Sequence, residues 1–479
     1  MSSMRNTILA VVTSMCVAMP SLAGGAQQVQ PVEGTWLGTL QVPAMKLRVV
    51  FHITAQPDGS LGATLDSPDQ GATGIEVSRV ALEKDRLTLE ASVIQGRYEG
   101  TLSPDGSTID GKWTQGGISL DLPLQRVDEA PKAKRPQEPE KPYPYIEEEA
   151  TYENAKAGVT LAGTLTMPRA GGPFPAVLLI TGSGVQDRDE TVFGHKPFLI
   201  LSDYLTRRGI AVLRVDDRGV GGSKGDASQA TSADFADDAR AGVEYLKGRQ
   251  EIDPKRIGLI GHSEGGIIAP MVAVRSPDVA FIVLLAGTGV TGEKIVEGQI
   301  ARILKSTGAD QAIIDSALEN QRKVVELVKQ ETDPNALKQK VRVIVEDAVS
   351  RLDEAQKKAI GYSDAYVEMQ AAAVTSKWFR FFLLHDPATV LRKVKCPVLA
   401  INGELDMQVA AQENLPAIER ALREAGNTRI TIQELPGLNH LFQTAQTGAF
   451  NEYAQIEETM SPSALETVAK WIEDQTKPR

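Results

Sequence analysis

The chain has 479 residues, enough for two or three domains. Its 62 acidic and 51 basic side chains give a formal net charge of −11 at pH 7. An acidic chain without a basic cluster argues against nucleic acid and anionic membrane surfaces as its partners. After the first residues, no apolar stretch is long and uncharged enough to span a membrane. We therefore expect a soluble protein with no stable membrane span.

The first 23 residues have the pattern of a secretory signal peptide. Arg5 supplies the positive charge, residues 7–19 form an apolar segment too short to span a bilayer, and small residues precede a cleavage site after Ala23. This predicts an exported protein, periplasmic or secreted. Cleavage leaves 479 − 23 = 456 residues and removes Cys16, so that Cys396 has no internal partner. Because Cys396 precedes an apolar run, we interpret it as a buried structural thiol.

Residues 31–127 predict a small all-β domain, either a barrel or a sandwich. Alternating apolar and polar residues at 46–53 and 86–90 are separated by tight-turn sequences such as Pro-Asp-Gly at 57–59. Residues 128–144 contain five prolines among lysines and glutamates, which predicts an extended linker without a core of its own.

From residue 145 to residue 477, strands alternate with helices. This alternation predicts an α/β domain whose parallel sheet is covered on both faces. Ser232 is the predicted cap of a helix over 233–247. Residues of about 291–376 predict a helical cap inserted after a strand. The other predicted elements are strands at 174–180, 210–215, 257–260, 280–286, 397–402 and 430–435, and a helix at 198–208.

The most informative segment is Gly-His-Ser-Glu-Gly at 261–265, which directly follows an apolar strand. Gly-x-Ser-x-Gly between a strand and a helix is the pattern of a nucleophile elbow, in which a strained turn exposes a serine. The two glycines let the strand and the helix pass closely, and the helix N-terminus directs N–H groups toward an oxyanion. We predict that Ser263 is a nucleophile.

The acid and the base are expected in loops after later strands, in the order Ser…Asp…His. Asp406 follows one strand end and is preferred to Glu404, and His440 lies in the loop after the next strand. The chain has only five histidines. We interpret His262 as a residue that shapes the site, and we leave open that His195 lines the pocket.

The oxyanion needs two donors. One is the backbone N–H of Glu264, and the other is the N–H of Ser183 or Gly184 in the loop after the strand at 174–180. The acidic and basic side chains that follow at 187–190 predict an ion-pair network. We expect Trp378 or Phe379 to line an apolar acyl pocket, together with Phe442 after the base.

Four segments together resemble exported bacterial α/β-hydrolases of the serine aminopeptidase-like and dienelactone hydrolase-like branches. They are Gly-Ser-Gly-Val-Gln-Asp-Arg-Asp at 182–189, Asp-Asp-Arg-Gly-Val-Gly at 216–221, Gly-His-Ser-Glu-Gly-Gly at 261–266 and Gly-Leu-Asn-His-Leu-Phe-Gln at 437–443. The resemblance covers residues 145–477, and the β domain is similar to a module that often precedes such hydrolases. It implies an α/β-hydrolase fold, a triad of Ser263, Asp406 and His440, and neither cofactor nor metal.

The sequence therefore predicts a serine hydrolase that cleaves small carboxylic esters through an acyl-enzyme. An aminopeptidase, an amide or thioester hydrolase and an acyltransferase are alternatives on the same fold. A non-catalytic binding protein is a further alternative, which would be expected to lack triad residues. The acyl and alcohol groups, the oligomeric state and the role of the β domain do not follow from the sequence.

Overall fold

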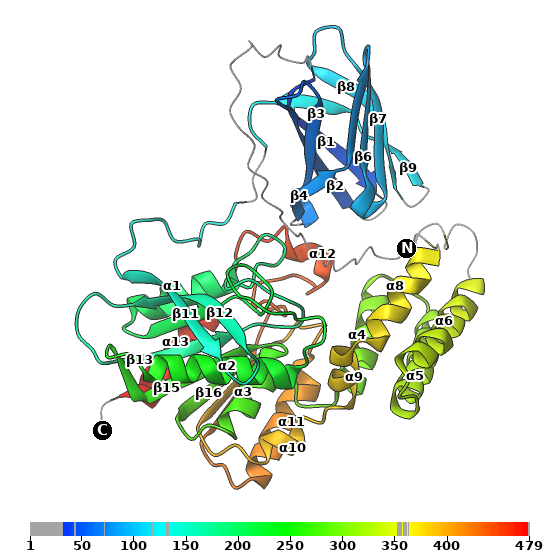
Figure 1. The fold of residues 1–479 in the computed structure, drawn as a ribbon. Coiled ribbons are helices and arrows are strands. Elements are labelled where there is room, and N and C mark those ends of the chain that lie inside the picture. The colour runs from blue at the N-terminus through cyan, green and yellow to red at the C-terminus, as the bar shows by residue number, and fades with distance from the viewer. Residues whose placement is uncertain are drawn as a thin grey trace. The chain divides into compact units, whose positions relative to one another are not determined.

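The computed structural model describes residues 32–42, 45–70, 72–115, 118–130, 134–351, 357, 362 and 364–477. The predicted signal peptide and Cys16 lie outside these residues. The chain divides into two compact units (Figure 1). The first contains the N-terminal strands and takes in residues from 346 to 368, and the second comprises 134–345 and the chain from 369 onward.

The first unit contains one antiparallel sheet of ten strands. The sheet curls around a single apolar core that includes Trp36, Phe51 and Tyr98, and β3 and β4 near one end contact β5 and β6 near the other. Its strands are β1 Gly34–Val42, β2 Met45–Ala55, β3 Leu61–Ser67, β4 Ala72–Val77, β5 Arg79–Glu83, β6 Arg86–Ala91, β7 Gly96–Leu102, β8 Thr108–Gln115, β9 Ile118–Asp121 and β10 Leu124–Val127.

The second unit contains an eight-stranded sheet in the order β11-β12-β14-β13-β15-β16-β17-β18. β11, β12 and β14 pair antiparallel, and the strands from β14 to β18 are parallel. The strands are β11 Ile146–Asn154, β12 Val159–Met167, β13 Phe174–Ile180, β14 Ala211–Val215, β15 Ile252–His262, β16 Val279–Leu285, β17 Val398–Gly403 and β18 Ile430–Leu435.

Helices cover both faces of this sheet (Figure 1). Side chains alternate between the faces along a strand, so Ala176 and Leu178 of β13 pack with α2, α3 and α11, whereas Val177 and Leu179 pack with α1 and α13. The covering helices are α1 Pro197–Arg207, α2 Ser232–Lys247, α3 Gly265–Ala273, α10 Ala388–Leu391, α11 Ala411–Glu424 and α13 Pro462–Thr476, and α12 Phe450–Tyr453 is a short helix after β18.

A helical segment separates β16 from β17, where the sequence predicted a cap. Its apolar side chains form a separate small core around Val325, Val328 and Leu383. The helices of this segment are α4 Gly292–Ser306, α5 Gln311–Gln330, α6 Pro334–Ser350, α8 Asp364–Thr375 and α9 Lys377–Leu384.

Two local features differ from the sequence-based expectations. The cap of α2 is Thr231, whose backbone N–H donates to Asp234 at 2.8 Å, and Ser232 is the first helical residue. The prediction that Ser232 caps this helix is therefore wrong. In the predicted linker, Arg135 donates hydrogen bonds to the carbonyl oxygens of Gly194 and Ile456 in the second unit, at 3.0 and 3.1 Å. This end of the linker is thus bound to the second unit.

Candidate active site

The residue predicted as the nucleophile lies at a sharp turn between β15 and α3. Ser263 has a φ of +53°, in the left-handed region that a non-glycine residue adopts only at a cost. A Cβ atom at Gly261 would lie 2.0 Å from the Gly265 carbonyl oxygen, and one at Gly265 would lie 2.2 Å from the Ile180 carbonyl oxygen. Both positions therefore require glycine, and the half-buried serine is held at the C-terminal edge of the sheet.

Asp406 and His440 lie in loops after β17 and β18, and their side chains are in contact. His440 Nδ1 lies 2.8 Å from Asp406 Oδ2, with both side chains almost fully buried. The other carboxylate oxygen of Asp406 accepts the backbone N–H groups of Gln408 and Val409, each at 2.8 Å. Because a carboxylate can only accept, Nδ1 of His440 carries the proton. This tautomer leaves the Nε2 lone pair of His440 free to accept a proton.

The rival acid, Glu404, does not contact the histidine. Its Oε2 accepts the backbone N–H of Gly437 at 2.9 Å, at the start of the His440 loop. His195 is fully buried between Thr459 and the Tyr453 carbonyl oxygen, and burial lowers its pKa to about 4. His195 is therefore a neutral residue that joins two loops.

The loop after β13 borders the nucleophile. A Cβ atom at Gly182 would lie 3.3 Å from the Cβ of Ser263, so this glycine permits the close approach. The N–H of Gly182 is occupied, because it donates to Glu190 Oε1 at 2.7 Å. Within the described chain, the N–H groups of Ser183, Gly184 and Glu264 have no hydrogen-bond acceptor. All three predicted oxyanion donors therefore remain available.

His262, next to the nucleophile, is hydrogen-bonded on both ring nitrogens. Nδ1 lies 2.9 Å from Glu190 Oε1, and Nε2 lies 3.0 Å from the His440 carbonyl oxygen. Burial alone would lower the pKa of His262, but the Glu190 carboxylate and the His440 carbonyl hold it above its ordinary value. The interpretation of His262 as a residue that shapes the site agrees with these contacts.

Glu264 has a buried carboxylate behind the elbow. Its Oε1 accepts the Ser232 hydroxyl at 2.6 Å and the indole N–H of Trp378 at 2.8 Å. Burial raises the pKa of Glu264, while hydrogen bonds from Ser232, Trp378 and Ser183 act in the opposite direction. Glu264 thus joins α2 and α9 to the nucleophile elbow.

A further acidic side chain, Asp217, lies after β14. Burial raises the pKa of Asp217 to about 8, although the Gln186 N–H and the Thr181 hydroxyl stabilise its charged form. A cavity of about 40 Å³ lies against Asp217, Gly184 and Glu264.

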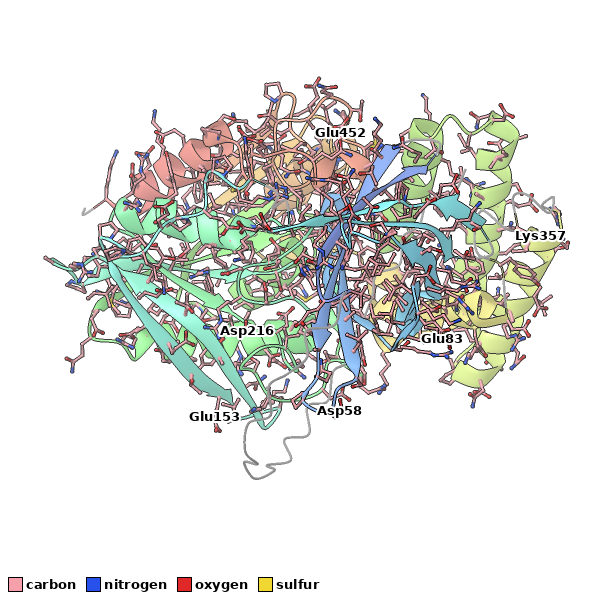
Figure 2. The ribbon with its side chains drawn as sticks, turned by 90° about the horizontal axis from the view of Figure 1, so that it is seen from above. Asp58, Glu83, Glu153, Asp216, Lys357 and Glu452 are labelled. Carbon is pink, nitrogen blue, oxygen red and sulfur yellow. The ribbon has the colours of Figure 1, made fainter. Side chains whose placement is uncertain are left out.

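Three of the four charged residues at 187–190 form ion pairs with partners outside that segment. Arg188 binds Asp216, which follows β14 and is labelled in Figure 2, at 2.8 Å. Asp189 pairs with Arg214, and Glu190 pairs with His262. The loop after β13 is therefore fixed to β14 and β15.

The predicted pocket aromatics have different surroundings. Trp378 is stacked on Phe382, with ring centroids 5.4 Å apart, and contacts Glu264. Phe379 packs with the core of the helical segment. Phe442 is buried in the core next to α1 and α13, beside a small cavity that His262 and Glu190 also line. Trp378 is thus hydrogen-bonded to the elbow, and Phe442 packs edge-on against His262 with ring centroids 6.4 Å apart. A pocket role for Trp378 or Phe379, and for Phe442, remains a prediction.

The sequence did not single out Glu190 and Asp217 as individual site residues. The close approach of Glu190 to His262 has no local signal, because 72 positions separate the two residues. Asp217 lies in the Asp-Asp-Arg-Gly motif, which carried the family resemblance but assigned no role to this carboxyl.

Across the described residues, no group of three or more histidine, cysteine, aspartate or glutamate side chains is suited to hold a metal ion. The same residues contain no helix with the length and apolar character that crossing a membrane requires.

Comparisons with known proteins define the family. The model of the X-Pro dipeptidyl-peptidase (S15) family matches residues 157–434, which is more than half of the chain. Esterase EstD of Thermotoga maritima is 25% identical over 329 residues, covering 68% of this chain and 69% of EstD. An uncharacterized Mycobacterium tuberculosis protein is 34% identical over 125 residues, 26% of this chain and 41% of that protein.

Several solved structures are also similar to the chain, at low sequence identity. An esterase from Pyrococcus furiosus is 16% identical, with a TM-score of 0.42, over 70% of this chain and 91% of the esterase. The sheet order and the family model agree with the α/β-hydrolase fold expected from the sequence. The chain therefore belongs to the X-Pro dipeptidyl-peptidase (S15) family of α/β-hydrolases.

Proposed function

We propose that this protein is a serine hydrolase that cleaves carboxylic esters through an acyl-enzyme on Ser263. The observation that carries the proposal is the strained elbow, in which Ser263 has a φ of +53° between two glycines that no larger residue can replace. Backbone strain of this kind persists where the surrounding structure enforces it, as it does at active sites. The protonated Nδ1 of His440 beside Asp406 supports the assignment of a general base.

In the proposed reaction, Ser263 Oγ attacks the ester carbonyl while His440 Nε2 takes the hydroxyl proton. Asp406 holds the imidazole ring in the required tautomer and stabilises the imidazolium that forms. His440 then gives the proton to the departing alkoxide, which leaves as an alcohol. Water, activated in turn by His440, releases the acid from Ser263.

The negative charge that develops on the carbonyl oxygen needs preorganised donors. Glu264 N–H lies at the start of α3, where the helix dipole also favours an anion. The N–H of Ser183 or Gly184 would supply the second hydrogen bond. Support for this role comes from the lack of acceptors for these three groups within the described chain.

Esters are preferred over peptides in this proposal because an alkoxide needs less acid assistance to leave than an amine does. The similarity to Esterase EstD supports this choice. The matching family model favours a second candidate, release of dipeptides from substrates with proline in the second position. An acyltransferase would use the same acyl-enzyme and transfer the acyl group to an alcohol.

A substrate panel on the purified protein distinguishes these functions. Short-chain acyl esters are expected to have a kcat/KM at least about tenfold above the values for aminoacyl amides and X-Pro amides. A tenfold ratio corresponds to a difference of about 1.4 kcal/mol in transition-state stabilisation. Faster release of amines from X-Pro amides than of alcohols from esters would contradict the ester assignment. An acyl-transfer product formed in preference to the free acid, with an added alcohol, would identify a transferase.

A further inference from the structure

Three parts of the candidate site meet at one buried ion pair. Glu190 Oε1 accepts both the Gly182 N–H, at 2.7 Å, and His262 Nδ1, at 2.9 Å. On the opposite side of the ring, His262 Nε2 lies 3.0 Å from the carbonyl oxygen of His440. The pair thus contacts the backbone of the loop after β13 and the backbone of the residue proposed as the base, and His262 itself precedes Ser263.

The hydrogen-bond partners define the charge of His262. A carboxylate oxygen and a backbone carbonyl oxygen can only accept, so each ring nitrogen must donate. An imidazole that donates from both nitrogens is an imidazolium. Both partners of the pair are almost completely buried, with side-chain exposures of 8% for His262 and 4% for Glu190. Removing one charge would leave the other buried and unpaired, which is costly.

We infer that His262, held as an imidazolium by Glu190, is a positioning residue that fixes the His440 loop and the oxyanion loop to the nucleophile elbow. This inference rests on the proposed function of the site. Neither side chain touches the reacting atoms in this assignment. Their effect is to keep the nucleophile, the base and the oxyanion donors at a constant spacing. The reaction rate depends strongly on this spacing.

The charged groups around His262 favour the imidazolium. Glu190 faces it from the loop after β13 and Asp406 from the loop after β17, while the His440 ring lies 4.9 Å away, centroid to centroid. Glu190 in turn faces Asp217. Since the folded-state pKa of His262 is raised, its stabilising contribution is complete below the ordinary histidine pKa of about 6.5 and is lost as the pH rises through the folded value.

Glu190→Gln tests the charge while preserving shape. Burial would leave His262 neutral in this variant, with one ring N–H. If the introduced amide oxygen still accepts hydrogen bonds from the Gly182 N–H and from His262 Nδ1, then His262 Nε2 carries no proton. The His440 carbonyl oxygen in that case loses its donor. If the introduced amide nitrogen turns toward His262 instead, the Gly182 N–H loses its acceptor. We expect labelling of Ser263 by a fluorophosphonate probe at pH 6.5 to slow by roughly 10- to 100-fold.

The experiment uses the full chain, with three readouts. Histidine-selective ¹⁵N NMR should show two N–H protons on His262 at pH 6.5 in the wild type and one in Glu190→Gln. The ratio of variant to wild-type labelling rates should rise toward one as the pH rises through the folded pKa of His262, because the wild type then loses its imidazolium too, whereas Glu190→Asp, which keeps the charge, should hold a constant ratio. Glu404→Gln alters a carboxylate that accepts the Gly437 N–H of the His440 loop and does not contact His262, so this variant should label like the wild type.

A single N–H proton on wild-type His262 would overturn the inference, as would wild-type labelling rates in Glu190→Gln. The inference would also be overturned if Glu190→Gln labels slowly, the ratio of labelling rates does not depend on pH, and His262 is still doubly protonated in the variant. Glu190 would then be a packing residue. Failure of the wild type to label at Ser263 would contradict the proposed function instead, and the NMR measurement would then decide the state of the ion pair separately.

Discussion

The nucleophile elbow and the helical segment before β17 are built by different kinds of contact. In the elbow, backbone atoms meet backbone atoms: a Cβ at Gly261 or Gly265 would overlap carbonyl oxygens at 2.0 and 2.2 Å. In the helical segment, side chains provide most of the packing, and α9 contacts the elbow through the Trp378 indole N–H. One close backbone contact occurs there, where a Cβ at Gly292 of α4 would lie 2.1 Å from the Phe382 carbonyl oxygen of α9. Backbone contacts allow almost no substitution, whereas side-chain contacts can be exchanged. Substitutions in the elbow are therefore expected to disturb the catalytic geometry, whereas substitutions in the helical segment can change the substrate specificity.

The largest effect is expected at the carboxylate that orients the base. Asp406→Asn should lower kcat by roughly 10⁴-fold, because an amide facing Nδ1 favours the tautomer in which Nε2 carries the proton. Steady-state kinetics on an ester substrate measures this loss, and a thermal melt checks the fold. Glu404→Gln serves as the matched control, since its carboxylate does not contact His440. A comparable loss in both variants would return Glu404 to consideration as the acid.

The next effect concerns the stability of the elbow. Gly265→Ala places a methyl group 2.2 Å from the Ile180 carbonyl oxygen, so we expect a loss of about 3 kcal/mol or more in the free energy of unfolding. Gly248→Ala is the control, because Gly248 has a helical φ of −75° and its added Cβ would lie 3.4 Å from the Tyr245 carbonyl oxygen. Denaturant titrations of both variants compare the two sites. Equal stability would show that the elbow backbone can relax.

The smallest effect is expected at the helical segment. Trp378→Ala should change the ratio of kcat/KM for long-chain over short-chain acyl esters by roughly tenfold, because apolar pocket contacts discriminate by about this amount per methylene. Phe379→Ala should lower the melting temperature and leave that ratio unchanged, since Phe379 packs with the core of the helical segment. An unchanged ratio in Trp378→Ala, with Ser263 still reactive toward the probe, would mean that the pocket is built elsewhere.

The difference between backbone contacts and side-chain contacts also explains what the sequence could predict. Buried parallel strands such as β16 were found because continuous runs of Val, Ile, Leu and Ala end at glycine or polar loops. The half-exposed β18 has the predicted bounds of 430–435, whereas β15 begins at residue 252, five residues before its predicted start. The contact between His440 and Asp406 followed from their positions after neighbouring strands. The strand positions follow from the local sequence pattern, and the contact of His440 with Asp406 follows from the topology of a parallel sheet.

Contacts between side chains distant in the sequence could not be predicted in this way. Glu264 and Trp378 are 114 positions apart, and His262 and the His440 carbonyl are 178 apart. The cap of α2 was placed one residue late, because serine ranks above threonine as a cap by residue type. Only tertiary packing shows that the Ser232 hydroxyl binds Glu264.

The central claim is that Ser263 is the nucleophile. The most direct measurement treats the wild type and Ser263→Ala with a fluorophosphonate probe and locates the adduct by mass spectrometry of the digested protein. The account predicts one adduct, on the peptide that contains Ser263, and no adduct in the variant. Equal labelling of the two proteins, or an adduct on a different residue of the wild type, would contradict it.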